Sequence, residues 1–216
     1  MLNITNEYCQ IVEIVTSFLK FNKQVLETSK DLIISLGSGS AATEMSSDLP
    51  CLCLDNDRRA IYSSIINLKG NVIGKKQFTY HSVFDIRRSN ELLSILQNIK
   101  HSLPDHTVKI LFQHPDPSLD STYDTCGKLC IKALCEKLIA EIHFVYDSKV
   151  DATCFKRDEI IDRFMLKSCS EVTIGEEFVI SEQDDISVIH PLFGFTSRLS
   201  WAKMKKGNEH TFCVKC

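Results

Sequence analysis

Two glycines and an aspartate near the start of the chain have the types and spacing needed to hold a nucleoside. Gly37 and Gly39 follow the apolar run LIISL at 32–36, and Asp55 ends the next apolar run, CLCL at 51–54. Without Cβ atoms, glycines let backbone N–H groups approach a ligand closely and allow turns that other residues resist. A carboxylate beside them can accept the hydroxyl hydrogens of a ribose. This set favours an adenosine-type ligand, and the alternative is a tight turn beside a solvated acid.

A second polar group follows the apolar run VKILF at 108–112. It contains Gln113, His114 and Asp116 in the stretch QHPDPS, whose two prolines fix their own φ angles and restrict the residues before them. A carboxylate or imidazole held in this way could orient an acceptor or take its proton. Asp116 is therefore our first catalytic candidate and His114 the second. The alternative is a rigid surface turn with exposed polar side chains.

The elements that must position these residues follow a regular alternation. Short, nearly continuous apolar runs are typical of parallel strands buried on both faces, and they alternate with amphipathic stretches of helical period. The runs cover 32–36, 51–54, 108–112 and 141–146, and the amphipathic stretches cover 58–68, 90–103 and 126–140. This order predicts an α/β fold: a doubly wound, mostly parallel sheet with helices on both faces. Ligands of such sheets bind beyond the carboxyl ends of the strands.

The two ends of the sequence are expected to complete the same unit. Residues 1–29 predict a helical segment packed on the sheet. LSWAKM and HTFCVK predict an antiparallel hairpin with Gly207 and Asn208 at its turn. Because the sequence contains no linker, repeat or low-complexity tract, we expect a single domain over residues 1–216. His143, inside the run EIHFVY, is expected to be packed in the core.

The glycine stretch also fits a dinucleotide-binding pattern. Residues 37–42, GSGSAA, satisfy G-x-G-x-x-G/A, so an NAD(P)-dependent oxidoreductase must be considered. No Tyr is followed four residues later by Lys, as a short-chain dehydrogenase would need. A chain of this length also leaves little room for a separate substrate domain, and a terminal hairpin is foreign to most dinucleotide folds. The oxidoreductase is therefore the least favoured hypothesis.

LIISLGSGSA followed by LCLDNDRRAI resembles motifs I and II of the class I S-adenosylmethionine-dependent methyltransferases. The resemblance implies a Rossmann-like, seven-stranded sheet that ends in an antiparallel hairpin, with S-adenosylmethionine as cofactor. It implies that Gly37 and Gly39, with Ser38 between them, pass close to the methionine portion of the cofactor. It further implies that Asp55 holds the ribose and that Asn56 lies beside the adenine.

Two further stretches resemble parts of the same family. FTYHSVFDI at 78–86 is similar to the third strand and its loop, where an acid often meets the adenine amino group. Ser82 and Asp85 both remain candidates for that position. The QHPDPS stretch corresponds to motif IV, beside the transferred methyl group, which adds Gln113 to the implied cofactor contacts.

The sequence departs from the family pattern at two positions. Ser35 stands where the family often has an acid, and Ala41 stands where a third glycine is common. Neither change prevents binding, because the backbone supplies much of the contact. The leading hypothesis is a methyltransferase, and the second is a methyltransferase-like domain that has lost turnover and serves as a binding or scaffold protein.

The acceptor is open among nucleic acid, protein and small molecule. Residues 115–117, PDP, resemble the guanine-N7 tRNA methyltransferases, but LDSTYDTCGK replaces the Arg/Lys-rich stretch that follows in those enzymes. A net charge of −3 and a pI near 6.2 do not suggest long-range attraction to a polyanion. RNA therefore has little support as the acceptor, and the oligomeric state is open.

The cysteines and the N-terminus bear on location and metal binding. The stretch MLNITNEYCQ lacks the basic start and apolar core of a signal peptide, and no apolar run reaches the length needed to cross a bilayer. We therefore expect an intracellular protein, in the cytoplasm or the nucleus, with reduced thiols. Cys213 and Cys216 have metal-ligand spacing, but no second such pair completes four ligands, so we expect no metal.

Overall fold

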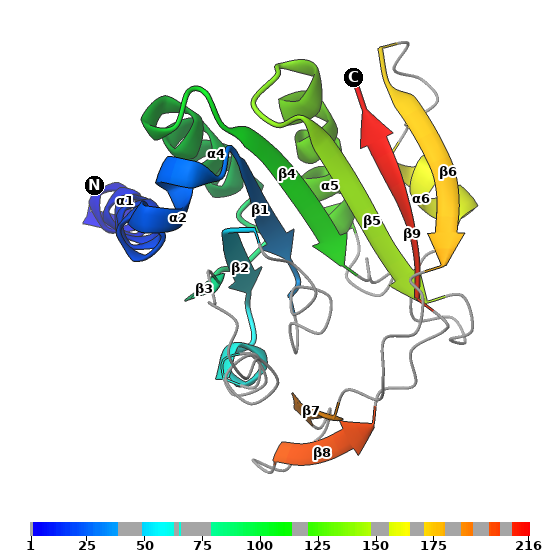
Figure 1. Ribbon diagram of the computed structural model, residues 1–216, viewed down its shortest axis with the longest axis horizontal. Coiled ribbons are helices and arrows are strands. Elements are labelled where there is room, and N and C mark those ends of the chain that lie inside the picture. Colours follow the sequence, from blue (N-terminus) through cyan, green and yellow to red (C-terminus); the bar gives the residue numbers. More distant parts are fainter. Residues whose placement is uncertain are drawn as a thin grey trace.

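The apolar runs of the sequence become strands of one sheet in a computed structural model of the chain (Figure 1). The structure describes residues 2–38, 49–62, 65, 79–113, 121–147, 156–164, 171–179, 187–191, 199–203 and 209–216. The sheet has seven strands in the order β3-β2-β1-β4-β5-β9-β6. Their bounds are β1 Asp31–Leu36, β2 Cys51–Asp55, β3 Thr79–Val83, β4 Thr107–Gln113, β5 Glu141–Asp147, β6 Thr173–Val179 and β9 Glu209–Lys215.

The strands β1 to β5 are parallel, and the strand order reverses between β1 and β4. The chain moves outward from β1 to β2 and β3 and then returns to the other side of β1. The neighbouring carboxyl ends of β1 and β4 therefore form the topological switch point, where ligands of open α/β sheets bind. The four strands expected from the apolar runs are confirmed as β1, β2, β4 and β5.

The last strand of the sheet, β9, runs antiparallel between β5 and β6. This arrangement confirms the expected fold class, a mostly parallel seven-stranded sheet with an antiparallel C-terminal pair. The pairing expected for this strand was wrong. HTFCVK pairs with β5 and β6, whereas LSWAK forms β8 (Leu199–Lys203) and pairs with β7 (Ser187–Pro191) in a separate two-stranded sheet. The expected turn residues, Gly207 and Asn208, lie outside the described residues.

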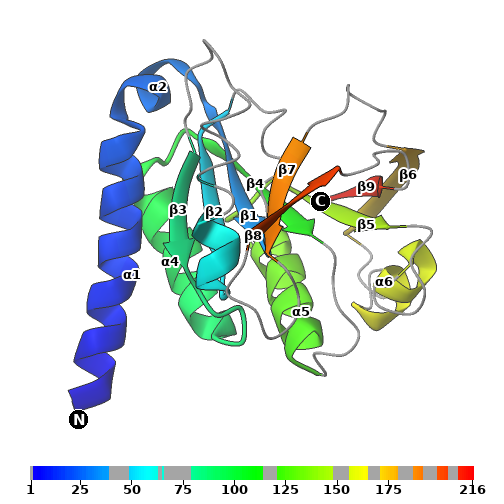
Figure 2. The same cartoon turned by 90° about the horizontal axis from the view of Figure 1, so that it is seen from below.

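Helices α4 (Ser89–Ser102), α5 (Ser121–Cys135) and α6 (Arg157–Arg163) lie on the same face of the sheet (Figures 1 and 2). The side chains beneath them are mostly apolar, because alternate residues of each strand point to this face. The core includes Leu32, Ile34, Leu36, Leu52, Leu54, Val108, Ile110, Phe112, Ile142, Phe144, Phe212 and Val214, all nearly inaccessible. At the centre of this core, aromatic rings on β4, β5 and β9 contact one another and the ring of Phe164, the residue after α6.

The N-terminal segment forms two helices, α1 (Leu2–Phe21) and α2 (Lys23–Thr28). They are separated at the buried Asn22, whose side-chain amide donates a hydrogen bond to the Phe18 carbonyl. Helix α1 packs against α4 and contacts β3, so it extends the core beyond the edge of the sheet (Figure 2). None of the helices in the described part of the chain is both long and apolar enough to cross a membrane.

The opposite face of the sheet is more polar than we expected. Ile33, Lys109 and Leu111 on this face are only half-buried, although their strand neighbours on the helix face are inaccessible. The expectation that these runs are buried on both faces is therefore wrong for this part of the sheet. His143 lies on the same face, and its side chain is 36% exposed rather than packed in the core. The order strand, glycines, strand also predicts a short helix after Gly39, and that segment lies outside the described residues.

Helix α5 ends earlier than its sequence pattern suggested. We expected a helix over 126–140, but the helix ends at Cys135. Lys137 adopts a positive φ of 58°, and the Leu138 amide donates to the Ala133 carbonyl, five residues back. The Lys137 amide donates to Leu134 in the same turn, which completes a Schellman-type end. A lysine in the place usually taken by glycine hides this stop signal from sequence analysis.

Candidate functional site

The candidate site lies at the carboxyl ends of β1, β2 and β4. Gly37 directly follows β1, has a φ of 70°, and its amide donates a 2.9 Å hydrogen bond to the Leu54 carbonyl of β2. That bond places the turn after β1 against the residue that precedes Asp55. Gly37 and Asp55, the two features singled out in the sequence, are thus brought to one edge of the sheet. Gly39 lies outside the described residues.

A side chain in place of Gly37 would strain the turn after β1. A Cβ atom there would lie 3.3 Å from the Gln113 carbonyl oxygen, and φ is in the region that L-residues rarely adopt. The next residue, Ser38, is buried, and its hydroxyl has no hydrogen-bond partner among the described residues. A buried polar group without a partner costs stability unless a ligand or water satisfies it. Ser38 therefore fits a position that contacts a bound polar molecule.

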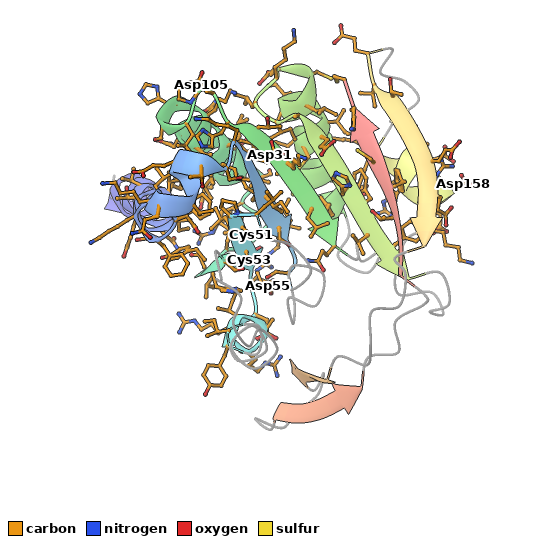
Figure 3. All side chains as sticks on the ribbon, viewed as in Figure 1. Asp31, Cys51, Cys53, Asp55, Asp105 and Asp158 are labelled. Atoms are coloured by element: carbon orange, nitrogen blue, oxygen red, sulfur yellow. The ribbon has the colours of Figure 1, made fainter. Side chains whose placement is uncertain are left out.

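Asp55 ends β2 with its side chain on the face shared by Cys53 and Ser35. The residue is 8% exposed, and its Oδ1 accepts the Asp57 amide at 2.8 Å. The bond closes a local turn that fixes the carboxylate at the sheet edge. Figure 3 shows Asp55 at the carboxyl end of β2, whereas Asp31 stands near the far end of the sheet. Asn56 follows Asp55 and is exposed, so its side chain is accessible to a ligand.

A buried polar pair bridges the switch point between β1 and β4. The Gln113 side-chain amide donates a 2.9 Å hydrogen bond to the Ser35 hydroxyl, and both residues are inaccessible or nearly so. This bond places the side chain of Gln113 across the end of β1. The pair is uncharged, in contrast to the acid that the family resemblance would place at Ser35. Any charge offered to a ligand at this edge therefore comes from other residues, such as Asp55 at the end of β2.

The two candidates for the adenine contact occupy different places. Ser82 pairs with Leu54, so its side chain belongs to the helix face of the sheet, opposite that of Asp55. Asp85 stands in the loop beyond β3 and forms a 2.6 Å ion pair with Arg87. The hydrogen bond from Arg87 lowers the pKa of Asp85, so this carboxylate is ionised at neutral pH.

The motif IV candidates His114 and Asp116 lie outside the described residues. Gln113, the residue before them, ends β4 at the same edge as Gly37. Helix α5 begins soon afterwards at Ser121. The described structure thus fixes the strand that leads into the QHPDPS stretch.

Sequence analysis missed a histidine next to this edge. His81 on β3 pairs with Cys53 of β2, which places its ring on the same face as Asp55. Burial lowers the pKa of His81 to about 4, so the imidazole is neutral at physiological pH. The alternation of TYHSV, with Tyr80 on the core side, was the available signal. It was missed because the run is short and only partly apolar.

We expect His81 to make the protein less stable in mild acid. Its folded pKa of about 4 lies below the ordinary value of 6.5, so between these values only the unfolded chain takes up the proton. The contribution of neutral His81 to the free energy of unfolding is therefore complete above pH 6.5 and is lost as the pH falls towards 4. Between pH 7 and pH 5 the free energy of unfolding should fall by up to about 2 kcal/mol. Urea unfolding of His81→Gln at both pH values should show a smaller loss than the wild type. His101→Gln, at the exposed end of α4, is the control, and an equal loss in all three proteins would contradict the prediction.

The sequence matches no protein-family model and no curated protein. Solved structures with a similar arrangement include the N-methyltransferase NodS from Bradyrhizobium japonicum, at 10% identity over 94% of this chain and 93% of that one, with a TM-score of 0.46. A SAM-dependent methyltransferase from Methanosarcina mazei is 12% identical over 87% of this chain and 93% of its own, with a TM-score of 0.44. The 16S rRNA methylase ArmA is 12% identical over 97% of this chain and 86% of its own, with a TM-score of 0.42. This likeness concerns the fold alone.

Proposed function

We propose that the chain binds S-adenosylmethionine at the carboxyl edge of β1, β2 and β4 and transfers its methyl group to an acceptor. The observation that carries the proposal is the joint geometry of Gly37 and Asp55. A tight glycine turn is hydrogen-bonded to the residue before a nearly buried carboxylate, at the switch point of the sheet. At this edge, backbone N–H groups can contact the charged methionine portion of the cofactor, and the Asp55 carboxylate can accept hydrogen bonds from the ribose hydroxyls.

The described residues offer complementary contacts for such a cofactor. The Asp55 carboxylate would accept the ribose hydroxyls, and the glycine turn would approach the methionine portion without steric conflict. The buried hydroxyl of Ser38 would gain the partner that it lacks among the described residues. Of the two candidates for the contact with the adenine amino group, we favour Asp85. The side chain of Ser82 lies on the other face of the sheet from Asp55, whereas the ionised carboxylate of Asp85 can accept a hydrogen bond from the amino group.

When bound, S-adenosylmethionine supplies an electrophilic methyl group on a sulfonium. The task of the protein is then to align the acceptor with that methyl group and to receive a proton where the acceptor carries one. We assign these roles to Asp116 first and His114 second, because the strand that ends at Gln113 leads directly to them. Nucleic acid, protein and small molecule stay open as acceptors.

One observation favours a second candidate, a binding or scaffold protein without turnover. The Ser35 hydroxyl already accepts the Gln113 amide, so this pair offers a ligand less charge than an acid at Ser35 would. Weaker binding of the methionine end would follow. An NAD(P)-dependent oxidoreductase is less favoured, because the dinucleotide fold continues the strand order 3-2-1-4-5-6 in parallel, whereas β9 here enters antiparallel beside β5.

We expect S-adenosylmethionine and S-adenosylhomocysteine to raise the melting temperature, and NAD to leave it unchanged, because a ligand that binds only the native state stabilises it. Asp55→Asn should weaken binding by roughly 10- to 100-fold, the effect of losing hydrogen bonds to a charged group. Asp31→Asn is the matched control, because its carboxylate is 42% exposed near the other end of the sheet. Thermal shift and calorimetry measure both effects.

The outcomes separate the hypotheses. Stabilisation by NAD alone would favour the oxidoreductase, and equal losses in the two asparagine variants would remove Asp55 from the site. Binding without release of S-adenosylhomocysteine in the presence of candidate acceptors would favour the scaffold. Asp116→Ala, which should bind the cofactor and lose turnover, tests the assignment of the catalytic residue.

A further inference from the structure

Three side chains with metal-ligating atoms meet on the polar face of the sheet. Glu141 and His143 stand two residues apart on β5, and Cys213 on β9 is paired directly opposite His143. One ligand atom from each lies within 4.8 Å of the other two. Because Glu141 begins β5 and pairs with Lys215 near the end of β9, the cluster lies away from the carboxyl edge that carries Gly37 (Figure 1).

Two of the separations between these side chains are close to those between zinc ligands. The Nε2 atom of His143 is 3.2 Å from a carboxylate oxygen of Glu141, and Sγ of Cys213 is 3.7 Å from the other. Zinc bonds of ordinary length at tetrahedral angles separate nitrogen from oxygen by about 3.4 Å and sulfur from oxygen by about 3.6 Å. The carboxylate of Glu141 thus lies about as far from His143 and from Cys213 as neighbouring zinc ligands lie from one another, and all three ligand atoms are within 4.8 Å of one another.

We propose that Glu141, His143 and Cys213 bind a zinc ion whose fourth position is taken by water. Carboxylate, imidazole and thiolate are all zinc ligands, and three protein ligands leave one position open to solvent. The ligands come from β5 and β9, so the ion would tie the antiparallel strand to the parallel part of the sheet. The site is independent of the proposed methyl transfer.

The strand geometry explains why Cys213 and Cys216 do not form a metal site together, although their spacing is that of metal ligands. Cys213 and Cys216 are three residues apart, and side chains three apart along a strand point to opposite faces. Accordingly, Sγ of Cys216 lies 3.7 Å from Sγ of Cys135 at the end of α5, on the helix side. The two cysteines of the motif cannot share a metal. The partners of Cys213 lie on β5, far away in the sequence.

Two lysines compete with a cation for Glu141. Lys215 Nζ is 2.8 Å from its carboxylate and Lys109 Nζ is 3.0 Å away. Both can release it: the Lys215 side chain is 59% exposed, and Lys109 has a second partner in Asp31 at 3.4 Å. Zinc binding would replace these contacts and displace the thiol proton of Cys213, so one proton is released for each ion bound.

The test is a titration of the full chain with Co²⁺, which stands in for zinc and gives a thiolate-to-metal absorption band. The wild type should bind one ion with this band, and Zn²⁺ should abolish it. Cys213→Ser should lose the band and weaken binding at least about 10-fold, since even the outer partners of metal ligands contribute that much. Cys216→Ser, which removes the other thiol of the motif, should behave like the wild type.

A second variant keeps all three ligands and removes only a lysine that competes with the ion for the Glu141 carboxylate. Lys215→Met should tighten binding on the order of tenfold, because it removes a like charge beside the ion. This prediction holds even if Cys213→Ser folds poorly. Absence of the band in the wild type, its survival in Cys213→Ser, its loss in Cys216→Ser, or unchanged affinity in Lys215→Met would each overturn the site.

Discussion

Gly37→Val is expected to lower the affinity for S-adenosylmethionine on the order of 100-fold, which corresponds to about 2.7 kcal/mol. The residue has a φ of 70°, which a β-branched side chain adopts only as a strained outlier. Its Cβ would lie 3.3 Å from the Gln113 carbonyl oxygen. Relief requires the turn after β1 to move, and this displaces the N–H groups and the buried Ser38 from the proposed ligand position. The strain should also lower the free energy of unfolding by roughly 1–3 kcal/mol.

Calorimetry with S-adenosylhomocysteine and urea unfolding separate the two effects of Gly37→Val. Gly175→Ala is the matched control, because a Cβ there would also be tight, at 3.1 Å from the Cys213 carbonyl oxygen, but without a positive φ. Gly175 lies on β6, away from β1. It should cost stability and leave the affinity unchanged. Equal affinity in Gly37→Val and the wild type would show that the turn does not contact the ligand.

The parallel strands could be predicted because each is an apolar run with its own boundaries. LIISL and CLCLD need no knowledge of their neighbours to be recognised, since a strand covered by helices must be apolar at least on that face. The position of Gly37 and Asp55 at one edge followed from the same pattern and the parallel direction. Their roles in ligand binding are still predictions.

The partner of the last strand could not be predicted in the same way. A hairpin between LSWAK and HTFCVK is the nearest local solution, and sequence signals report local pairing best. The strand β9 instead inserts between β5 and β6, where Phe212 and Val214 face the side chains opposite them, Phe144 and Ile142. That choice depends on the burial of apolar area among segments far apart in the chain.

The polar face was visible in the sequence but was not recognised. In EIHFVY the residues Ile142, Phe144 and Tyr146 alternate with Glu141 and His143, which is the period of a strand with polar side chains on one face, although Val145 on that face is buried. The run was interpreted as buried on both faces because the parallel sheet suggested it. The Ser35–Gln113 hydrogen bond needed more information still, since it depends on β1 and β4 being neighbours.

Phe144→Ala is expected to lower the free energy of unfolding by about 3–5 kcal/mol, the usual cost of truncating a fully buried aromatic side chain. The ring is inaccessible and lies 5.2 to 5.6 Å, centroid to centroid, from the rings of Phe112, Phe164 and Phe212. These residues come from β4, the end of α6 and β9. The cavity would therefore open where these three elements meet β5.

Urea unfolding at neutral pH should show the loss of stability as a lower midpoint with an unchanged slope. Phe21→Ala makes the same substitution on a ring that is 56% exposed, and should cost less than about 1 kcal/mol. Gly127 limits how far the core can refill the cavity: the Phe164 ring lies so close to this glycine that a Cβ there would be 2.6 Å from it. Phe164 is therefore held on its far side by α5 and has little freedom to rotate. Equal costs for the two alanine variants would mean that the aromatic cluster does not anchor β9 to the sheet.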